Sequence, residues 1–203
     1  MTEGYIKYQC NWQPAEIIIP DEQFEALTKV RRQLFDLGLI GVYPDGIGFG
    51  NISVRENDGK SFFITGSATG QFTELEQKHY ARVVDYSFAE NWLLCVGLTK
   101  ASAESLTHAA VYETLPEIGA VVHIHCLWLW KKLLHINPTT SSEIEYGTPE
   151  MAGAISRLVS ETGNARQKVL VMGGHEEGIL AFGRSLEEAT NEILNIYNQY
   201  KHD

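Results

Sequence analysis

One short segment near the middle of the chain, residues 120–125 with the sequence AVVHIH, most constrains the fold. Its length and its β-branched residues are typical of a buried β-strand. Residues two positions apart on a strand point to the same face, so His123 and His125 would hold their imidazoles side by side. Two adjacent neutral imidazoles often begin a transition-metal site. The alternative is that both histidines end a strand and face solvent.

Helical and strand-like patterns alternate along the rest of the chain. Apolar spacing predicts helices over about residues 21–37, 103–115, 149–160 and 186–200, and a shorter one within 126–134. Strand-like runs occupy residues 52–54, 62–64, 81–86, 92–96, 120–125, 169–172 and 179–182. This alternation, without repeats or linkers, predicts a single α/β or α+β domain over residues 1–203, with residues 1–20 as an N-terminal extension.

Local signals indicate where helices and turns begin and end. We expect Asp21 to cap the first helix and Gly38 to end it, and we expect Ser102 to cap the second helix. Residues 57–59 are expected to form a tight turn. His135, at the end of the short apolar helix, is expected to cap that helix rather than to bind a metal ion.

Composition limits the classes of partner. The 203 residues carry a net charge of −10, which argues against general binding to nucleic acid or to anionic membranes. No apolar run approaches the ~20 residues of a membrane span, and no signal-peptide pattern is present. The three cysteines, Cys10, Cys95 and Cys126, are too widely spaced to form a CxxC pair. We therefore expect a reduced, cytoplasmic protein.

Two loops of small residues flank the hairpin predicted between residues 52 and 64. They cover residues 41–51 and 65–70 and are rich in Gly, Ser, Thr and Asn. If the loops lie together, their backbone N–H groups and hydroxyls could bind a phosphate. The alternative is a pair of ordinary turns, since neither loop matches a P-loop or a dinucleotide-binding motif.

Two further residues are candidates for chemistry. His175 lies in a glycine-flanked turn between two predicted strands, and such a turn can project a functional side chain from a rigid base. Three histidines can hold a divalent ion and leave positions open for substrate. Glu104, in the first turn of a predicted helix, is a candidate base for chemistry next to a carbonyl, and the alternative is that it stabilises the helix dipole.

Five sequence pieces occur in an order that resembles the class II aldolase/adducin family. They are GNIS at 50–53, ITG at 64–66, SAE at 102–104 followed by His108 and Tyr112, AVVHIH at 120–125, and HEEGILAFG at 175–183. The resemblance spans about residues 21–200. It implies an α/β fold, a three-layer α/β/α sandwich around a mainly antiparallel sheet, assembled as a homotetramer with sites at subunit interfaces.

The resemblance also implies roles for individual residues. His123, His125 and His175 match metal ligands, and Glu104 matches the acid/base carboxylate. A divalent metal ion is therefore expected, Zn²⁺ first, with manganese, cobalt and iron(II) left open. The residues that match a cradle for the substrate phosphate are Gly50, Asn51, Thr65, Gly66 and Ser102.

The family includes fuculose- and rhamnulose-phosphate aldolases, ribulose-phosphate 4-epimerase and methylthioribulose-phosphate dehydratase. The resemblance implies a metal-dependent carbon–carbon lyase that cleaves a small sugar phosphate, or a related hydroxy-carbonyl compound, by a retro-aldol reaction through a metal-stabilised enediolate. A sugar-phosphate epimerase, a dehydratase and a non-catalytic, adducin-like interaction module are the alternatives. A catalytic tyrosine is common in the family, and Tyr146, Tyr197 and Tyr200 are candidates for it.

The sequence departs from the family pattern at three places. Ala103 replaces the second serine of the phosphate motif, which removes a hydroxyl donor. The turn that carries the third histidine usually reads His-Gly, but here it reads HEEG over residues 175–178, which places two carboxylates beside the expected metal position. Residues 137–147 form a short segment where the family often carries further substrate contacts. These departures leave the substrate open.

Overall fold

Strand β8 (Ala120–His125) lies inside the main sheet, and every one of its residues is buried. It pairs antiparallel with β4 (Asn51–Arg55) on one side and with β10 (Gly178–Gly183) on the other. Burial on both faces explains why nearly all of the segment is apolar. The computed structural model describes residues 5–56, 59–134, 136–161 and 167–201. The predicted strand is confirmed, and its two histidines are buried rather than exposed to solvent.

The sheet has eight strands in the order β1-β7-β6-β5-β4-β8-β10-β9. Its remaining strands are β1 (Gln9–Gln13), β5 (Phe62–Thr65), β6 (Tyr80–Ser87), β7 (Trp92–Val96) and β9 (Val169–Val171). Among the described strands of this sheet, all neighbouring pairs run antiparallel except β1 and β7, which run parallel. The expectation of a mainly antiparallel sheet is confirmed.

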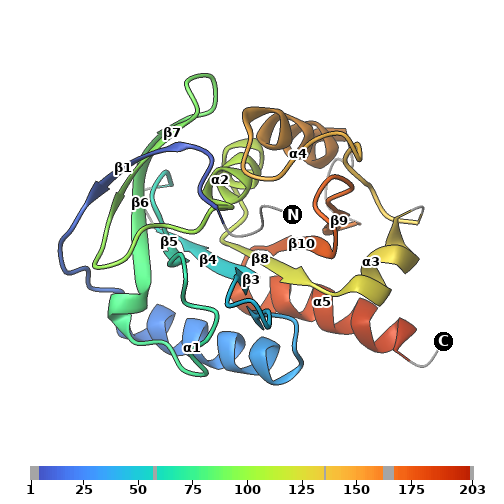
Figure 1. Ribbon diagram of the computed structural model, residues 1–203, viewed down its shortest axis with the longest axis horizontal. Coiled ribbons are helices and arrows are strands. Elements are labelled where there is room, and N and C mark those ends of the chain that lie inside the picture. Colours follow the sequence, from blue (N-terminus) through green and yellow to red (C-terminus); the bar gives the residue numbers. More distant parts are fainter. Residues whose placement is uncertain (1–4, 57–58, 135, 162–166, 202–203) are drawn as a thin grey trace.

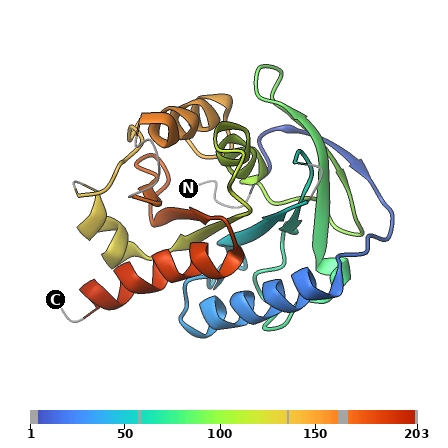
Figure 2. The same ribbon diagram turned by 180° about the vertical axis from the view of Figure 1, so that it is seen from behind.

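Helices cover both faces of the sheet, as Figures 1 and 2 show from opposite sides. Helices α2 (Ser105–Thr114) and α4 (Pro149–Glu161) pack on one face. The other face is covered by α1 (Asp21–Asp36), α3 (Leu127–Leu133) and α5 (Leu186–Tyr200). This is the three-layer α/β/α sandwich that the resemblance implies. Among the helices of the described chain, none combines the length and the apolar character that crossing a bilayer requires.

Side-chain alternation along β8 divides its residues between two apolar cores. Val122 and Ile124 enter the core beneath α1 and α5, and Val121 enters the core beneath α2 and α4. Because residues two apart share a face of a strand, His123 and His125 continue the face of Val121. The two imidazoles therefore point toward the layer that contains α2 and α4.

Helix ends agree with the sequence patterns only in part. Gly38, with a φ of +69°, follows the end of α1 as predicted. Asp21 is not the cap of this helix but its first residue, because Pro20 holds the N-cap position. Ser102 is not the cap of α2, because its hydroxyl accepts a hydrogen bond from the Glu104 amide in a separate turn and Glu104 holds the N-cap position.

Two elements of the fold were not predicted. Residues 9–13 form the edge strand β1 although their sequence, QCNWQ, has no regular apolar pattern, since most of this strand faces solvent. The glycine-rich segment after α1 contains a small hairpin of β2 (Gly41–Val42) and β3 (Gly48–Phe49) rather than a loop alone. The short turn of helix that the sequence predicts from Glu74 to Lys78 is present as a 3₁₀ helix (Gln77–His79), which precedes β6. The expected turn at residues 57 and 58 and the expected capping by His135 lie outside the described residues.

A buried polar cluster connects α2 to the sheet. Nδ1 of His108 lies 2.7 Å from Ser53 Oγ, which in turn lies 2.7 Å from the hydroxyl of Tyr112. Burial lowers the pKa of His108 to about 3, so this imidazole is neutral in the folded protein at neutral pH. An unfolded chain, with an ordinary histidine pKa of about 6.5, takes up a proton that the folded chain does not. The folded state therefore loses stability as the pH falls from about 6.5 toward 3.

We expect the substitution His108→Gln to make the fold less sensitive to acid. The variant should lose about 1–3 kcal/mol of stability near neutral pH because the contact with Ser53 is disturbed. Between about pH 7.5 and pH 5, the wild type should lose about 2 kcal/mol more than the variant. Urea unfolding at both pH values, with a chelator present to remove metal effects, measures the difference. Equal losses in the two proteins would contradict a neutral His108.

Candidate functional site

The antiparallel pairing of β10 with β8 brings three histidines together. His123 and His125 project from β8, and His175 lies in the turn just before β10, whose Gly178 is opposite His125. Gly178 has no room for a side chain, because a Cβ atom there would lie 2.9 Å from the His175 carbonyl oxygen and 3.2 Å from His123 Cε1. The sheet register thus positions all three expected metal ligands at one end of β8.

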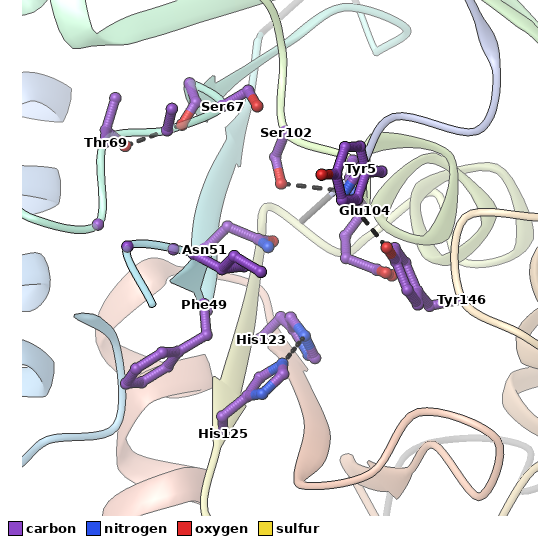
Figure 3. Close-up of a pocket in the computed structure, with 18 residues that line it drawn as sticks. Tyr5, Phe49, Asn51, Ser67, Thr69, Ser102, Glu104, His123, His125 and Tyr146 are labelled. Atoms are coloured by element: carbon purple, nitrogen blue, oxygen red, sulfur yellow. Dashed lines mark hydrogen bonds between the residues drawn. The ribbon is translucent and has the colours of Figure 1, made fainter. Parts of the chain in front are cut away.

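The three imidazoles form a tight, buried cluster. Their ring centroids lie 4.7–5.1 Å apart, and one ligand nitrogen from each ring lies within 4.8 Å of the other two. Each histidine is at most 3% exposed. The closest approach is 3.1 Å, between Nε2 of His123 and Nε2 of His125, and Figure 3 shows these two rings facing each other.

Hydrogen bonds on the far side of two rings indicate where their protons lie. Nδ1 of His123 lies 3.2 Å from the carbonyl oxygen of Ile179, and a carbonyl only accepts, so this nitrogen carries the proton. Tyr43 donates its hydroxyl to Glu177 Oε2 at 2.5 Å, so the same hydroxyl oxygen accepts the Nδ1 proton of His125 at 2.8 Å. When both rings are neutral, as metal binding requires, Nε2 of each ring then carries a lone pair.

Two lone pairs that face each other at 3.1 Å repel unless a cation lies between them. Tetrahedral zinc, with zinc–nitrogen distances of about 2.0–2.1 Å, holds two ligand nitrogens roughly 3.3 Å apart, which is close to this spacing. Burial, and then the neighbouring His125 and His175, lower the pKa of His123 well below its ordinary value. Metal binding needs neutral imidazoles. The three histidines therefore fit a divalent ion with further positions open.

Glu104 lies at the start of α2 and is directed toward this cluster. Its side chain is buried, and Oε1 lies 3.6 Å from Nδ1 of His175. The other oxygen, Oε2, accepts a hydrogen bond from the hydroxyl of Thr107 at 2.7 Å. Although Glu104 holds the N-cap position, its side chain makes no capping hydrogen bond. A capping role therefore does not explain why a carboxylate is buried here.

A small cavity opens beside Glu104 and the two strand histidines, as Figure 3 shows. Its volume is about 170 Å³, and most of its wall comes from three short segments, residues 46–51, 66–70 and 102–104. The two predicted loops of small residues thus lie on one cavity. Among the described residues that line it there is no lysine or arginine. Backbone amides and hydroxyls are the groups that this wall offers to an anion.

Four of the five residues expected in the phosphate cradle line this cavity. They are Gly50, Asn51, Gly66 and Ser102. Thr65 is not among the lining residues, because its buried hydroxyl accepts a hydrogen bond from the Ile52 amide at 3.2 Å. Gly50 has a φ of +72°, and a Cβ atom there would lie 2.7 Å from Ile40 Cγ1, so both the backbone and the packing require glycine.

One of the three candidate tyrosines lies at the site. The ring of Tyr146 stacks on His175, with centroids 4.6 Å apart and an interplanar angle of 27°. Its hydroxyl accepts a hydrogen bond from the backbone amide of Tyr5 at 3.2 Å. Tyr146 and Tyr5 both line the small cavity. Tyr197 and Tyr200 instead contact residues of α3.

Sequence reasoning missed the two aromatic residues that contact His125. The hairpin β2–β3 carries Tyr43 and Phe49, whose rings lie 4.4 Å apart and pack beside the imidazole. The glycines of this segment predicted a loop and drew attention away from its aromatic residues. The signal that could have found them is the presence of two aromatic side chains in a segment otherwise made of small and turn-forming residues.

The longer turn after His175 places its two carboxylates in different environments. Glu176 is exposed, whereas Glu177 is partly buried and lies 3.8 Å from Nδ1 of His125. Interaction with His125, and also with Tyr43, lowers the pKa of Glu177, so its carboxylate is charged at neutral pH. Neither residue lines the small cavity. Both line a larger one of about 670 Å³, together with Lys7, Glu145, Tyr146, His175 and others.

Comparison with known proteins identifies the family. The family model described as "Class II Aldolase and Adducin N-terminal domain" matches residues 25–199. The chain belongs to the class II aldolase and adducin family. A solved L-fuculose 1-phosphate aldolase is similar, with a TM-score of 0.66 and 20% identity, covering 90% of this chain and 86% of that one. A sugar-phosphate aldolase from Thermotoga maritima gives a TM-score of 0.64 and 17% identity, covering 87% and 91%.

One relative of this chain is named a dehydratase, whereas the two solved structures above are named aldolases. Methylthioribulose-1-phosphate dehydratase from Leptospira interrogans is 33% identical over 108 residues, which cover 48% of this chain and 42% of the dehydratase. The chain thus spans less than half the length of that relative. At these identities, the solved structures support the fold, and the reaction has to be argued from the site.

We expect the substitution His123→Ala to abolish stoichiometric metal binding. It removes one of the two ligand nitrogens, Nε2 of His123, which lies 3.1 Å from Nε2 of His125. After reconstitution with zinc and removal of excess metal, the wild type should hold about one ion per chain by elemental analysis. His79→Ala is the control, since His79 bonds to the Glu76 amide away from the cluster. Full zinc content in His123→Ala would contradict the assignment of His123 as a ligand.

Proposed function

We propose that the protein is a metal-dependent carbon–carbon lyase of the class II aldolase type that cleaves a small sugar phosphate or a related hydroxy-carbonyl compound. The observation that carries this proposal is the buried carboxylate of Glu104, 3.6 Å from His175, on a cavity that also contacts His123 and His125. An interaction module has no need of a buried carboxylate and three buried imidazoles together. The adducin-like alternative is therefore the weaker one.

Glu104 is the residue proposed to move the proton. His123, His125 and His175 would hold a divalent ion, whose positive charge would polarise the carbonyl and hydroxyl oxygens of the substrate and stabilise enediolate charge. Glu104 lies on the wall of the cavity that a reacting carbon would enter, and the Thr107 hydroxyl holds one of its oxygens in place. The other oxygen is then positioned to exchange a proton with the substrate carbon.

The phosphate end of the substrate is assigned to the small cavity. Its wall offers backbone amides and the hydroxyls of Ser67 and Ser102, which suit an anion. Among the described residues that line the larger cavity, Asp45, Glu145, Glu176 and Glu177 lie beside a single lysine, so its charge does not favour a phosphate. We therefore propose that the substrate directs its phosphate toward the loops at 46–51 and 66–70.

A dehydratase is the second candidate, and the similarity to methylthioribulose-1-phosphate dehydratase favours it. Loss of water next to a carbonyl begins with removal of a proton from the carbon beside that carbonyl. The same carboxylate and the same metal position would serve that step. The two reactions differ in the bond that breaks afterwards, so product analysis separates them.

Further proposals concern the context of the site. We propose zinc as the resident ion, since three histidines suit it and leave a fourth position open. We also propose a cytoplasmic homotetramer in which the 203 residues act as one domain. Exposed large apolar side chains, among them Trp12, Phe72 and Leu98, are consistent with burial against other subunits.

Glu104→Gln is expected to keep its zinc and to lose turnover. Glutamine has nearly the same shape as glutamate but can neither accept the proton nor donate it to the substrate carbon, so turnover should fall roughly 10²–10⁴-fold. Zinc content and kcat are measured on the same samples. Glu161→Gln, an exposed substitution at the end of α4, is the matched control. Retained turnover in Glu104→Gln would remove Glu104 from the catalytic role.

A panel of ketose 1-phosphates and their unphosphorylated counterparts should identify the reaction. Mass spectrometry of the products distinguishes them, since cleavage gives two smaller carbonyl compounds and dehydration gives one product lighter by a water. We expect turnover of a phosphorylated compound with cleavage as the main outcome. Loss of water alone would favour the dehydratase. Turnover restricted to unphosphorylated substrates would contradict the phosphate assignment of the small cavity.

A further inference from the structure

We infer that Tyr43 and Glu177 act together as positioning residues that orient His125 for metal binding. This inference rests on the proposed function in one respect, namely that the three histidines hold a metal ion. It concerns the longer turn after His175, whose two carboxylates distinguish this chain from the usual His-Gly turn. It assigns one of those carboxylates a definite task and leaves the other without one.

The contacts form a continuous chain of hydrogen bonds. Glu177 Oε2 accepts the hydroxyl proton of Tyr43 at 2.5 Å, and the hydroxyl oxygen lies 2.8 Å from Nδ1 of His125. A hydroxyl has one proton, so donation to the carboxylate leaves its oxygen to accept from His125. The proton of the imidazole is thereby held on Nδ1, and Nε2 is left with the lone pair that faces His123.

The backbone of Glu177 supports a functional reason for this residue. Its φ is +71°, a conformation that glycine adopts readily and that residues with a side chain rarely adopt. Such strain at a non-glycine residue is a feature of functional sites. Glycine at this position would relieve the strain but would remove the carboxylate that contacts Tyr43. The backbone conformation does not explain why the residue is glutamate, whereas the hydrogen bond from Tyr43 to its carboxylate does.

The two strand histidines are oriented by different groups. A backbone carbonyl, that of Ile179, fixes the proton of His123. The proton of His125 is instead fixed by the hydroxyl of Tyr43, which in turn donates its own proton to the carboxylate of Glu177. A carboxylate in this position raises the basicity of the ligand nitrogen. Tyr43 and Glu177 should therefore strengthen metal binding beyond what three bare imidazoles provide.

The test measures zinc affinity by competition with a chromophoric chelator. Tyr43→Phe removes the hydroxyl and keeps the ring that packs on Phe49, and Glu177→Gln removes the charge and keeps the size. Each variant should bind zinc roughly 10–100-fold more weakly than the wild type, as substitutions of residues that orient metal ligands do. The double variant should lose little more than either single one, because both residues act through one chain of hydrogen bonds.

Two controls separate orientation of His125 from a general structural role. Glu176→Gln changes the neighbouring, exposed carboxylate and should leave zinc affinity within twofold of the wild type, about the precision of the measurement. Glu177→Gly relieves the backbone strain, so the metal-free chain should melt at the same or a higher temperature while its zinc affinity falls. A merely structural role for Glu177 predicts the opposite, a lower melting temperature with unchanged affinity.

A spectroscopic measurement reports on the imidazole directly. In the zinc-loaded wild type, the Nδ1 proton of His125 should give a slowly exchanging, downfield resonance, and Tyr43→Phe should lose it. Wild-type zinc affinity in both Tyr43→Phe and Glu177→Gln would overturn the inference and leave the proposed function standing. If the wild-type chain itself bound no zinc, the metal centre, and with it the proposed function, would be overturned as well.

Discussion

The burial of β8 on both faces is the constraint on which the rest of the structure depends. Because β4 and β10 flank this strand, its alternate residues must enter two different cores, and Val122 and Ile124 fill one of them. His123 and His125 necessarily take the opposite face, where α2 lies. The same pairing that buries the apolar residues thus removes two imidazoles from water. Burial favours the neutral form of an imidazole, as the lowered pKa of His123 shows, and neutral imidazoles are what a divalent ion binds.

Much of the fold could be predicted from sequence because its signals are local. The strand at 120–125 and the helices at 21–37, 149–160 and 186–200 follow from apolar spacing within each segment, and the structure has them within a residue or two. The start of α2 was displaced because the hydroxyl of Ser102 bonds within a turn that precedes the helix. Strand β1 gave no signal, since an edge strand that faces solvent needs no apolar face.

The site was predictable only as far as the resemblance reached. His123 and His125 are two residues apart, so strand geometry alone pairs them, but His175 joins them only through the register of β10 on β8. The contact between Tyr43 and Glu177 joins residues 134 positions apart in two segments that read as loops, and no local pattern indicates it. Thr65 is the opposite case. The family motif places it in the phosphate cradle, but in the structure its hydroxyl accepts a hydrogen bond from the backbone amide of Ile52.

The loops at 46–51 and 66–70 present dipoles rather than charged side chains to an anion that enters the small cavity. No lysine or arginine lies among the described residues on its wall, and Ala103 supplies no hydroxyl where the family has a second serine. Backbone amides and hydroxyls do not titrate across the physiological range. Recognition of a phosphate monoester there would therefore follow the ionisation of the ligand itself, whose second pKa lies near 6, rather than that of the cradle. Changes in cellular pH would then act on the substrate and leave the anion cradle unchanged.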